Sequence, residues 1–129
     1  MNTPGVPWVI AVDFNAHIFV DERKGGRTPS STAIQNFRDF IDGNYLSEAH
    51  STGLQYTWSN RQQGARKILS KIDRILANQE WMQKFMGWTY KVLSRVGSDH
   101  SPLIGWHTHI PKPENAPFRF VKAWTSSHA

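Results

Sequence analysis

The first regular pattern along the chain is a short apolar run at residues 8–12, which lies between Pro7 and Asp13. Its length and its β-branched members predict a fully buried strand that ends at Asp13. Residues 16–29 then combine acidic and basic side chains with two glycines and Pro29, which indicates a loop. Because ligand chemistry in open α/β sheets gathers where strands end, the residues around Asp13 are candidates for a site.

Apolar side chains three and four positions apart predict a helix over residues 31–42. Thr32 followed by Gln35 matches a capping box, and Gly43 marks the end of the helix. The apolar residues that would share its buried face are Ile34, Phe37, Phe40 and Ile41.

Alternation of apolar and polar residues predicts further short strands. Asn78 is placed to cap a short helix that carries Trp81 and Phe85. Residues 66–78 match two patterns equally well, because their apolar spacing fits a helix while their β-branched content favours a hairpin strand. The expected strands lie at residues 46–49, 56–58, 88–93 and 102–109, with a turn at 60–64 and a loop at 94–100.

The C-terminal part of the chain has a different composition. Three prolines between residues 111 and 117 break regular structure and are typical of a linker. After them, Phe118, Phe120 and Trp124 form a small apolar cluster that needs a surface to pack on. The expected organisation is therefore one domain over residues 1–110, followed by a proline-containing linker and tail over residues 111–129, toward a missing downstream region.

Composition narrows the classes of protein that fit. The chain has 129 residues, of which 39% are hydrophobic and 12% aromatic, as in a single folded domain. Because cysteine is absent, disulfides, thiolate metal sites and a cysteine nucleophile are excluded, and a metal would need oxygen or imidazole ligands. The sequence shows neither a signal peptide nor the ~18 apolar residues of a membrane span, so we expect a soluble, intracellular protein without a membrane partner.

The net charge of the chain bears on the kind of molecule it binds. A formal net charge of +5 favours a polyanion such as nucleic acid. The same charge is equally compatible with a basic protein that has no such partner, so composition leaves both interpretations open.

Three polar motifs are candidates for chemistry. The Asp-Phe-Asn tripeptide at residues 13–15 places a carboxylate and a carboxamide on the same side of an extended segment, where they can act on water and on a phosphoryl oxygen. The Ser-Asp-His tripeptide at 98–100 offers a carboxylate beside an imidazole. Asp73 lies in an apolar stretch and needs a positive partner if it is buried, for which His100 is the candidate. Taken singly, each has a plainer interpretation as a turn, a helix cap or an exposed strand residue.

The order of these motifs closely resembles the endonuclease domain of plant LINE-type (non-LTR) retrotransposons, within the endonuclease/exonuclease/phosphatase superfamily. The resemblance extends from about Trp8 to Trp124. It implies an α+β fold: half of a four-layer α/β sandwich, with one mostly antiparallel or mixed β-sheet and flanking helices. The segments that carry it are Asp13-Phe14-Asn15, Gly25-Gly26-Arg27-Thr28-Pro29, Thr57-Trp58-Ser59-Asn60, Ile72-Asp73-Arg74 with Trp81, Ser98-Asp99-His100-Ser101-Pro102, and Pro117-Phe118-Arg119-Phe120.

The resemblance also implies roles for individual residues. Asp13 would orient or activate the attacking water, and Asn15 would contact the scissile phosphate. Asp73 would orient His100, which stabilises charge on the phosphoryl group, while Asp99 would help to hold the divalent cation. Hydrolysis of DNA would then rest on Mg²⁺, or Mn²⁺, as Lewis acid and template.

The chain departs from the family in two ways. Val12 stands where the family usually has glycine, and a side chain there would crowd the site. The family's N-terminal half supplies an Asn, the Glu that is the principal metal ligand, and a phosphate-contacting Tyr or His, and nothing before Trp8 corresponds to it. We therefore expect a C-terminal half that binds metal weakly and is inactive alone, and whose exposed sheet face leads to self-association, to marginal stability or to a missing partner.

The leading hypothesis is a fragment of a Mg²⁺-dependent DNA endonuclease from a retroelement, with residence in the nucleus implied by the family's role. One alternative is a phosphoesterase of the same family that acts on a small phosphoester. The other is a non-catalytic module that binds nucleic acid through basic side chains. The candidate residues for nucleic-acid binding are Arg23, Lys24, Arg27, Arg61, Arg66 and Lys67.

Overall fold

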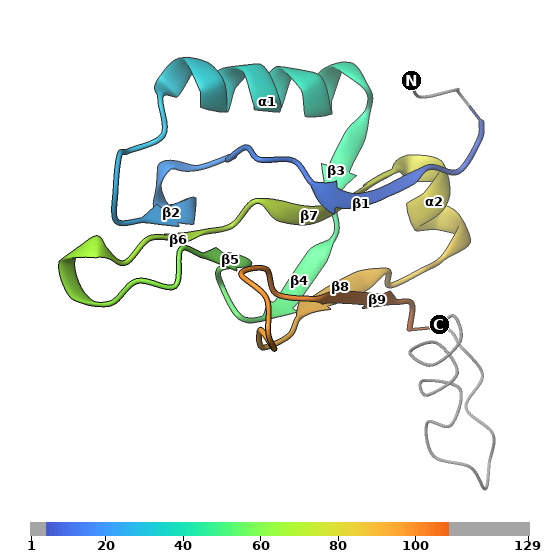
Figure 1. Ribbon diagram of the computed structural model, residues 1–129. Coiled ribbons are helices and arrows are strands. Elements are labelled where there is room, and N and C mark those ends of the chain that lie inside the picture. Colours follow the sequence, from blue (N-terminus) through green and yellow to red (C-terminus); the bar gives the residue numbers. More distant parts are fainter. Residues whose placement is uncertain (1–4, 109–129) are drawn as a thin grey trace, which may run out of the picture.

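The computed structural model describes residues 5–108, which form three small β-sheets, two α-helices and two short 3₁₀ helices (Figure 1). The mixed α+β class expected from the sequence is confirmed, with the strands divided among three sheets. In chain order the elements are β1 (Val9–Asp13), η1 (Val20–Glu22), β2 (Arg23–Lys24), α1 (Ser31–Gly43), β3 (Leu46–Glu48), β4 (His50–Gly53), β5 (Trp58–Ser59), η2 (Gly64–Arg66), β6 (Leu69–Ser70), β7 (Asp73–Asn78), α2 (Gln79–Lys84), β8 (Thr89–Val92) and β9 (Leu103–Trp106).

Strand β7 is the centre of the fold. It pairs antiparallel with β1 on one side and with β3 on the other, in the order β1-β7-β3. Successive side chains of a strand point to opposite faces, and both faces of β7 are covered. Leu76 packs in a cluster with Phe37 and Ile41 of α1, whereas Ile75 packs with Tyr90 and Val92 of β8. The stretch 66–78, which matched helix and strand equally, therefore forms β6 and β7.

Strand β1 ends at Asp13 as expected, but it is not fully buried. Residues 11–13 are exposed, and Val12 keeps 49% of its surface. The reason is its place in the sheet, because β1 has a neighbour only on the β7 side among the described residues. A continuous apolar run predicts burial on both faces, and that prediction fails at a sheet edge.

Helix α1 lies along one face of the β1-β7-β3 sheet, as Figure 1 shows. Its N-cap is Ser30, whose Oγ accepts a hydrogen bond from the Ala33 amide at 3.0 Å. The capping box expected at Thr32 is therefore wrong by two residues, because Ser30 is the first side chain able to reach a free amide of the opening turn. Helix α2 begins as expected, since Asn78 Oδ1 accepts from the Trp81 amide at 3.0 Å.

Two further sheets complete the fold and contain or adjoin the segments expected to be loops. Sheet β2-β6-β5 is antiparallel and pairs the segment after β1 with the segment before β7. Residues 16–29, expected to be a loop, thus contain η1 and β2. Sheet β4-β8-β9 is mixed, with β8 parallel to β4 and antiparallel to β9. The loop expected at residues 94–100 connects β8 to β9.

A buried charged network fixes β7 beside the position of Asp73. The Arg74 guanidinium is fully buried and bonds to the Glu22 carboxylate and, at 2.9 Å, to Glu48. Glu48 also accepts from Lys71 at 2.9 Å and from the Tyr90 hydroxyl. Burial acts to raise the pKa of Glu48, but Arg74, Tyr90 and Lys71 together outweigh it and hold that pKa below its usual value.

None of the helices within residues 5–108 is long and apolar enough to cross a membrane. The expected domain boundary at residue 110, the linker at 111–117 and the apolar cluster of Phe118, Phe120 and Trp124 lie outside the described residues.

Candidate active site

Two carboxylates meet where β1 ends and β7 begins. Asp13 is the last residue of β1, Asp73 is the first of β7, and the antiparallel register places them directly opposite each other. Paired residues of two neighbouring strands point to the same face of a sheet. The two carboxylates differ in exposure, because the Asp13 side chain is 43% exposed and that of Asp73 only 13%.

His100 completes the cluster from the loop between β8 and β9. Its Nδ1 lies 2.9 Å from Asp73 Oδ2, and its Nε2 lies 3.9 Å from Asp13 Oδ2. One ligand atom from each of the three side chains lies within 4.8 Å of the other two. The pairing of Asp73 with His100 predicted from the sequence is therefore present, and Asp13 and His100 lie at the same sheet edge.

The position of His100 depends on main-chain bonds to β5. Trp58 and His100 form an isolated antiparallel bridge. On either side of it, the Ser59 amide donates to the Asp99 carbonyl at 3.0 Å and the Ser101 amide donates to the Thr57 carbonyl at 2.7 Å. The loop is thus held as a short strand beside β5.

Thr57 connects this loop to Asp73. Its side chain is fully buried, and its Oγ1 accepts hydrogen bonds from the amides of Ile72 and Asp73, each at 3.0 Å. Its carbonyl accepts from Ser101, the neighbour of His100. One residue therefore positions both members of the Asp73–His100 pair. Sequence reasoning placed Thr57 in one of the resembling segments but gave it no role, although a hydroxyl between aromatic residues is the kind of polar group that needs partners when buried.

The environment of His100 raises its pKa. The main cause is the hydrogen bond to Asp73, with further attraction from the charges of Asp73, Asp99 and Asp13, and burial opposes these only in part. Because a carboxylate can only accept, Nδ1 carries a proton and Nε2 is the nitrogen left for chemistry. The raised pKa favours the imidazolium, in which Nε2 donates a hydrogen bond towards negative charge.

The backbone of Asn15 is not extended, although the sequence predicted an extended segment here. Its φ of +48° lies in the left-handed region, and its amide donates to Asp13 Oδ1 at 2.7 Å. The carboxylate and carboxamide are therefore not on one side of a continuous strand, because the chain turns directly after Asp13. The structure assigns to Asn15 the role of orienting the Asp13 carboxylate through its main chain.

Asp99 lies apart from the group formed by Asp13, Asp73 and His100. Its carboxylate accepts from Trp58 Nε1 at 3.2 Å, and this hydrogen bond is the main reason that the pKa of Asp99 is lowered. Asp99 is not among the three side chains whose ligand atoms gather in the cluster, and its carboxylate bonds to the Trp58 indole instead. This geometry does not favour Asp99 as a direct ligand in the same cluster. The charge of Asp99 nevertheless acts on His100 and helps to raise its pKa.

A hollow of about 500 Å³ lies beside Asp99 and is lined in part by Trp58 and Arg61. The charge of Arg61 also lowers the pKa of Asp99, after the larger effect of Trp58. Arg61 has a φ of +62° in the turn after β5. It is the candidate basic residue that the fold brings closest to this end of the site.

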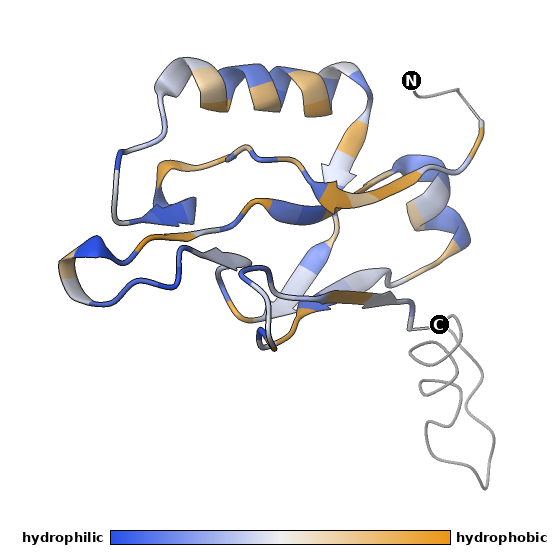
Figure 2. Cartoon of the chain, viewed as in Figure 1, coloured by the Kyte–Doolittle hydropathy of each residue, from blue (hydrophilic) through white to orange (hydrophobic). Residues whose placement is uncertain are grey.

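The other candidate basic residues gather around the β2-β6-β5 sheet. Arg23 and Lys24 form β2 and pair with Ser70 and Leu69 of β6. The loop between β5 and β6, which carries Arg66 and Lys67, comes so close that a Cβ on Gly25 would meet the Lys67 carbonyl oxygen at 2.1 Å. Figure 2 shows β2 in the hydrophilic colour. Arg23 is half-buried, and the exposed members are Lys24, Arg27, Arg61, Arg66 and Lys67.

The donor set of the cluster suits a hard cation bound through few protein ligands. Carboxylate oxygens are the ligands that Mg²⁺ prefers, and Mg²⁺ is commonly held by one or two carboxylates, with water and substrate phosphate completing its shell. Asp73 Oδ2 already accepts from His100, and Asp13 Oδ1 accepts from the Asn15 amide. With part of each carboxylate already engaged, the donor set of the described residues fits a weakly held divalent cation.

The fold and the cluster define a class of site: a carboxylate-oriented imidazole beside a second carboxylate, at the junction of two strands in an α+β fold. Comparisons with protein-family models, with curated proteins and with solved structures found no match to this chain.

Proposed function

We propose that the Asp13–Asp73–His100 cluster belongs to a divalent-metal-dependent phosphodiesterase that acts on DNA, as in the LINE-type endonuclease domains that the motifs resemble. The observation that supports the proposal most strongly is the hydrogen bond between His100 Nδ1 and Asp73, with Asp13 on the other side of the ring. Such an arrangement aims a protonated Nε2 at an anionic oxygen and keeps a carboxylate close enough to orient water.

In this proposal each residue of the cluster has a distinct task. Asp13, the exposed carboxylate, orients the attacking water and accepts its proton. His100 donates from Nε2 to a non-bridging phosphoryl oxygen, where negative charge grows as the water oxygen bonds to phosphorus. The P–O bond to one sugar oxygen breaks in return, and the leaving oxygen takes its proton from solvent. Asp73 keeps the imidazole protonated and correctly turned. A bound Mg²⁺ or Mn²⁺ would supply Lewis-acid stabilisation of the same phosphoryl group.

We also propose that this chain has only weak activity by itself. The cluster offers two carboxylates, and both are already engaged by neighbours. Metal affinity from so few ligands is low, and efficient nicking would need further ligands from outside the described residues. We therefore describe the chain as part of such an enzyme rather than as an efficient catalyst.

A metal-binding measurement tests the proposal even when turnover is too slow to detect. Binding of Mn²⁺ to the full chain should be weak and should be lost in Asp13→Asn. Asp42→Asn, on the exposed side of α1, is the matched control and should bind as the parent does. If Asp13→Asn and the parent bind Mn²⁺ equally, the cluster is not a metal centre.

A plasmid-nicking assay with Mg²⁺ completes the test. Any nicking by the parent chain should be slow and should disappear in Asp13→Asn and in His100→Ala. Robust nicking that depends on both residues would refute the proposed low activity, and nicking that survives both substitutions would refute the assignment of the site.

The basic surface around β2 and the β5–β6 loop supports a second candidate, a module that binds nucleic acid without cleaving it. Its affinity for duplex DNA should fall steeply with salt, because each phosphate contact releases counterions. Asp13→Asn and chelation of metal should leave that affinity unchanged. Binding that requires metal would favour the enzyme instead, and competition by small phosphoesters would indicate a smaller substrate.

A further inference from the structure

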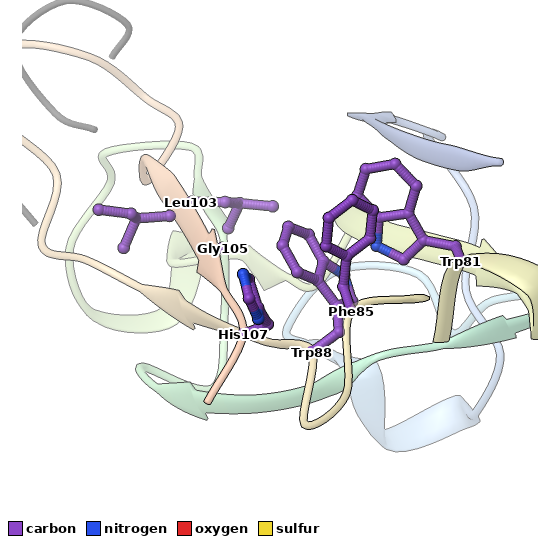
Figure 3. A pocket seen from close by; sticks show the side chains of 7 residues that line it. Trp81, Phe85, Trp88, Leu103, Gly105 and His107 are labelled. Atoms are coloured by element: carbon purple, nitrogen blue, oxygen red, sulfur yellow. The ribbon is translucent and has the colours of Figure 1, made fainter. Parts of the chain in front are cut away.

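An open apolar groove lies beside β9, apart from the Asp13–Asp73–His100 cluster. It encloses about 510 Å³. Figure 3 shows the rings of Trp81, Phe85 and Trp88 gathered on one side of it and His107 across from them. The residues that line the groove are Trp81, Phe85, Trp88, Leu103, Ile104, Gly105 and His107.

The groove is built for contact with aromatic side chains. The centroid of Phe85 lies 4.5 Å from that of Trp81 and 5.4 Å from that of His107. A Cβ on Gly105 would come within 2.9 Å of the Trp88 ring, so the glycine lets the indole lie directly against the strand. All of these rings remain only partly buried by residues 5–108. The surface is thus apolar, and its aromatic rings are incompletely covered.

The free edge of β9 is a further feature of the groove, and it favours an occupant with a main chain. Strand β9 is the last strand of its sheet, so across residues 5–108 its outer edge has no neighbouring strand. A segment that brought apolar side chains together with free main-chain N–H and C=O groups would cover the rings and pair with this edge.

The sequence that follows β9 has the matching composition. Phe118, Phe120 and Trp124 alternate with or follow polar and small residues in the tail beyond Pro117. Phe118 and Phe120 are two positions apart, the spacing that puts side chains on one face of an extended segment. Residues 109–117 separate the described chain from Phe118.

We propose that the segment 118–124 of this same chain docks in the groove between α2 and β9. Nine residues can span up to about 30 Å when extended, which is more than the few ångströms that separate His107 from the groove it lines. A short connection gives the tail an effective concentration in the millimolar range, so it outcompetes a second copy of the chain at micromolar concentrations. The prolines at 111, 113 and 117 restrict the connector and lower the entropy lost on docking.

Site-directed spin labelling of the full chain tests this docking. Because the chain contains no cysteine, Lys122→Cys provides a single place for a nitroxide label, between Phe120 and Trp124. The side-chain N–H signals of the tryptophans serve as reporters in a nitrogen-15 spectrum. We expect the signals of Trp81 and Trp88 to lose most of their intensity, and that of Trp58, near His100, to lose least.

The matched control carries the same label together with Phe118→Ser, Phe120→Ser and Trp124→Ser, and it should restore the signals of Trp81 and Trp88. A groove variant, Phe85→Ser, should restore the Trp81 and Trp88 signals as well without touching the tail. Equal broadening in parent and control, or none in either, would overturn the proposal. So would broadening that passes only from a labelled copy to a separate isotope-labelled copy, because the occupant would then be another molecule.

Discussion

Thr57→Val isolates the contribution of one buried hydroxyl to both the stability of the fold and the state of His100. Valine has the same shape as threonine but cannot accept the amides of Ile72 and Asp73, which Thr57 Oγ1 binds at 3.0 Å. Each buried donor left without a partner costs about 1–3 kcal/mol, so the two together predict a loss of about 2–6 kcal/mol in the free energy of unfolding. That is a large fraction of the ~5–15 kcal/mol typical of a whole domain.

Urea unfolding followed by circular dichroism measures the loss, and titration of His100 by NMR measures its consequence for the site. As the amide of Asp73 loses its anchor, the hydrogen bond to His100 weakens and the pKa of His100 falls towards its usual value. Thr52→Val, at an exposed position of β4, is the control and should change stability by less than about 0.5 kcal/mol. A Thr57→Val protein that keeps both its stability and the raised pKa would refute the positioning role of Thr57.

Four further predictions follow from the described contacts. Asp73→Asn should lower the pKa of His100 measured by NMR, because the carboxylate supplies both the main hydrogen bond and a charge; an unchanged pKa would contradict the pairing. The folded-state pKa of His100 is raised above its unfolded value of 6.5, so its contribution to stability is complete below pH 6.5 and is lost as the pH rises through the folded-state pKa. His100→Gln should remove that part of the pH dependence of urea unfolding, and a profile identical to the parent's would argue against it. Arg74→Met should destabilise the chain by about 3–5 kcal/mol, because it leaves the buried carboxylate of Glu22 and the half-buried carboxylate of Glu48 without their shared guanidinium partner, and a loss below about 1 kcal/mol would count against the network. Ser30→Ala should cost about 1 kcal/mol, whereas Thr32→Ala should cost much less, and the reverse order would restore Thr32 as the cap.

Local patterns in the sequence predicted much of the fold because they are set by local physics. The strand that ends at Asp13, the helix whose buried face contains Phe37 and Ile41, and the Asn78 cap all follow from spacing or from the reach of one side chain. The failures concern neighbours that are remote in sequence. The exposure of Val12 depends on which strand lies at the sheet edge, and the cap at Ser30 rather than Thr32 depends on the angle at which the chain enters α1.

The candidate site shows the same division. Asp13, Asp73 and His100 were chosen from the sequence, and the structure brings them together. The hydrogen bond that holds the Asp99 carboxylate against Trp58 could not be predicted, because it requires knowing that this loop bridges to β5. The positioning role of Thr57 was missed, although its segment was named, because the two amides that donate to it lie 15 and 16 residues away along the chain.

Because Asp13 pairs directly with Asp73, the site depends on the length of β1 more than on which apolar residues β1 contains. A deletion of one residue within β1 would send Asp13 to the opposite face of the sheet and, in the same step, turn Val9 and Ile10 away from the side chains they now cover. Among descendants of this chain, substitutions in β1 can therefore accumulate one at a time, whereas changes in its length would remove the carboxylate pair and the packing together.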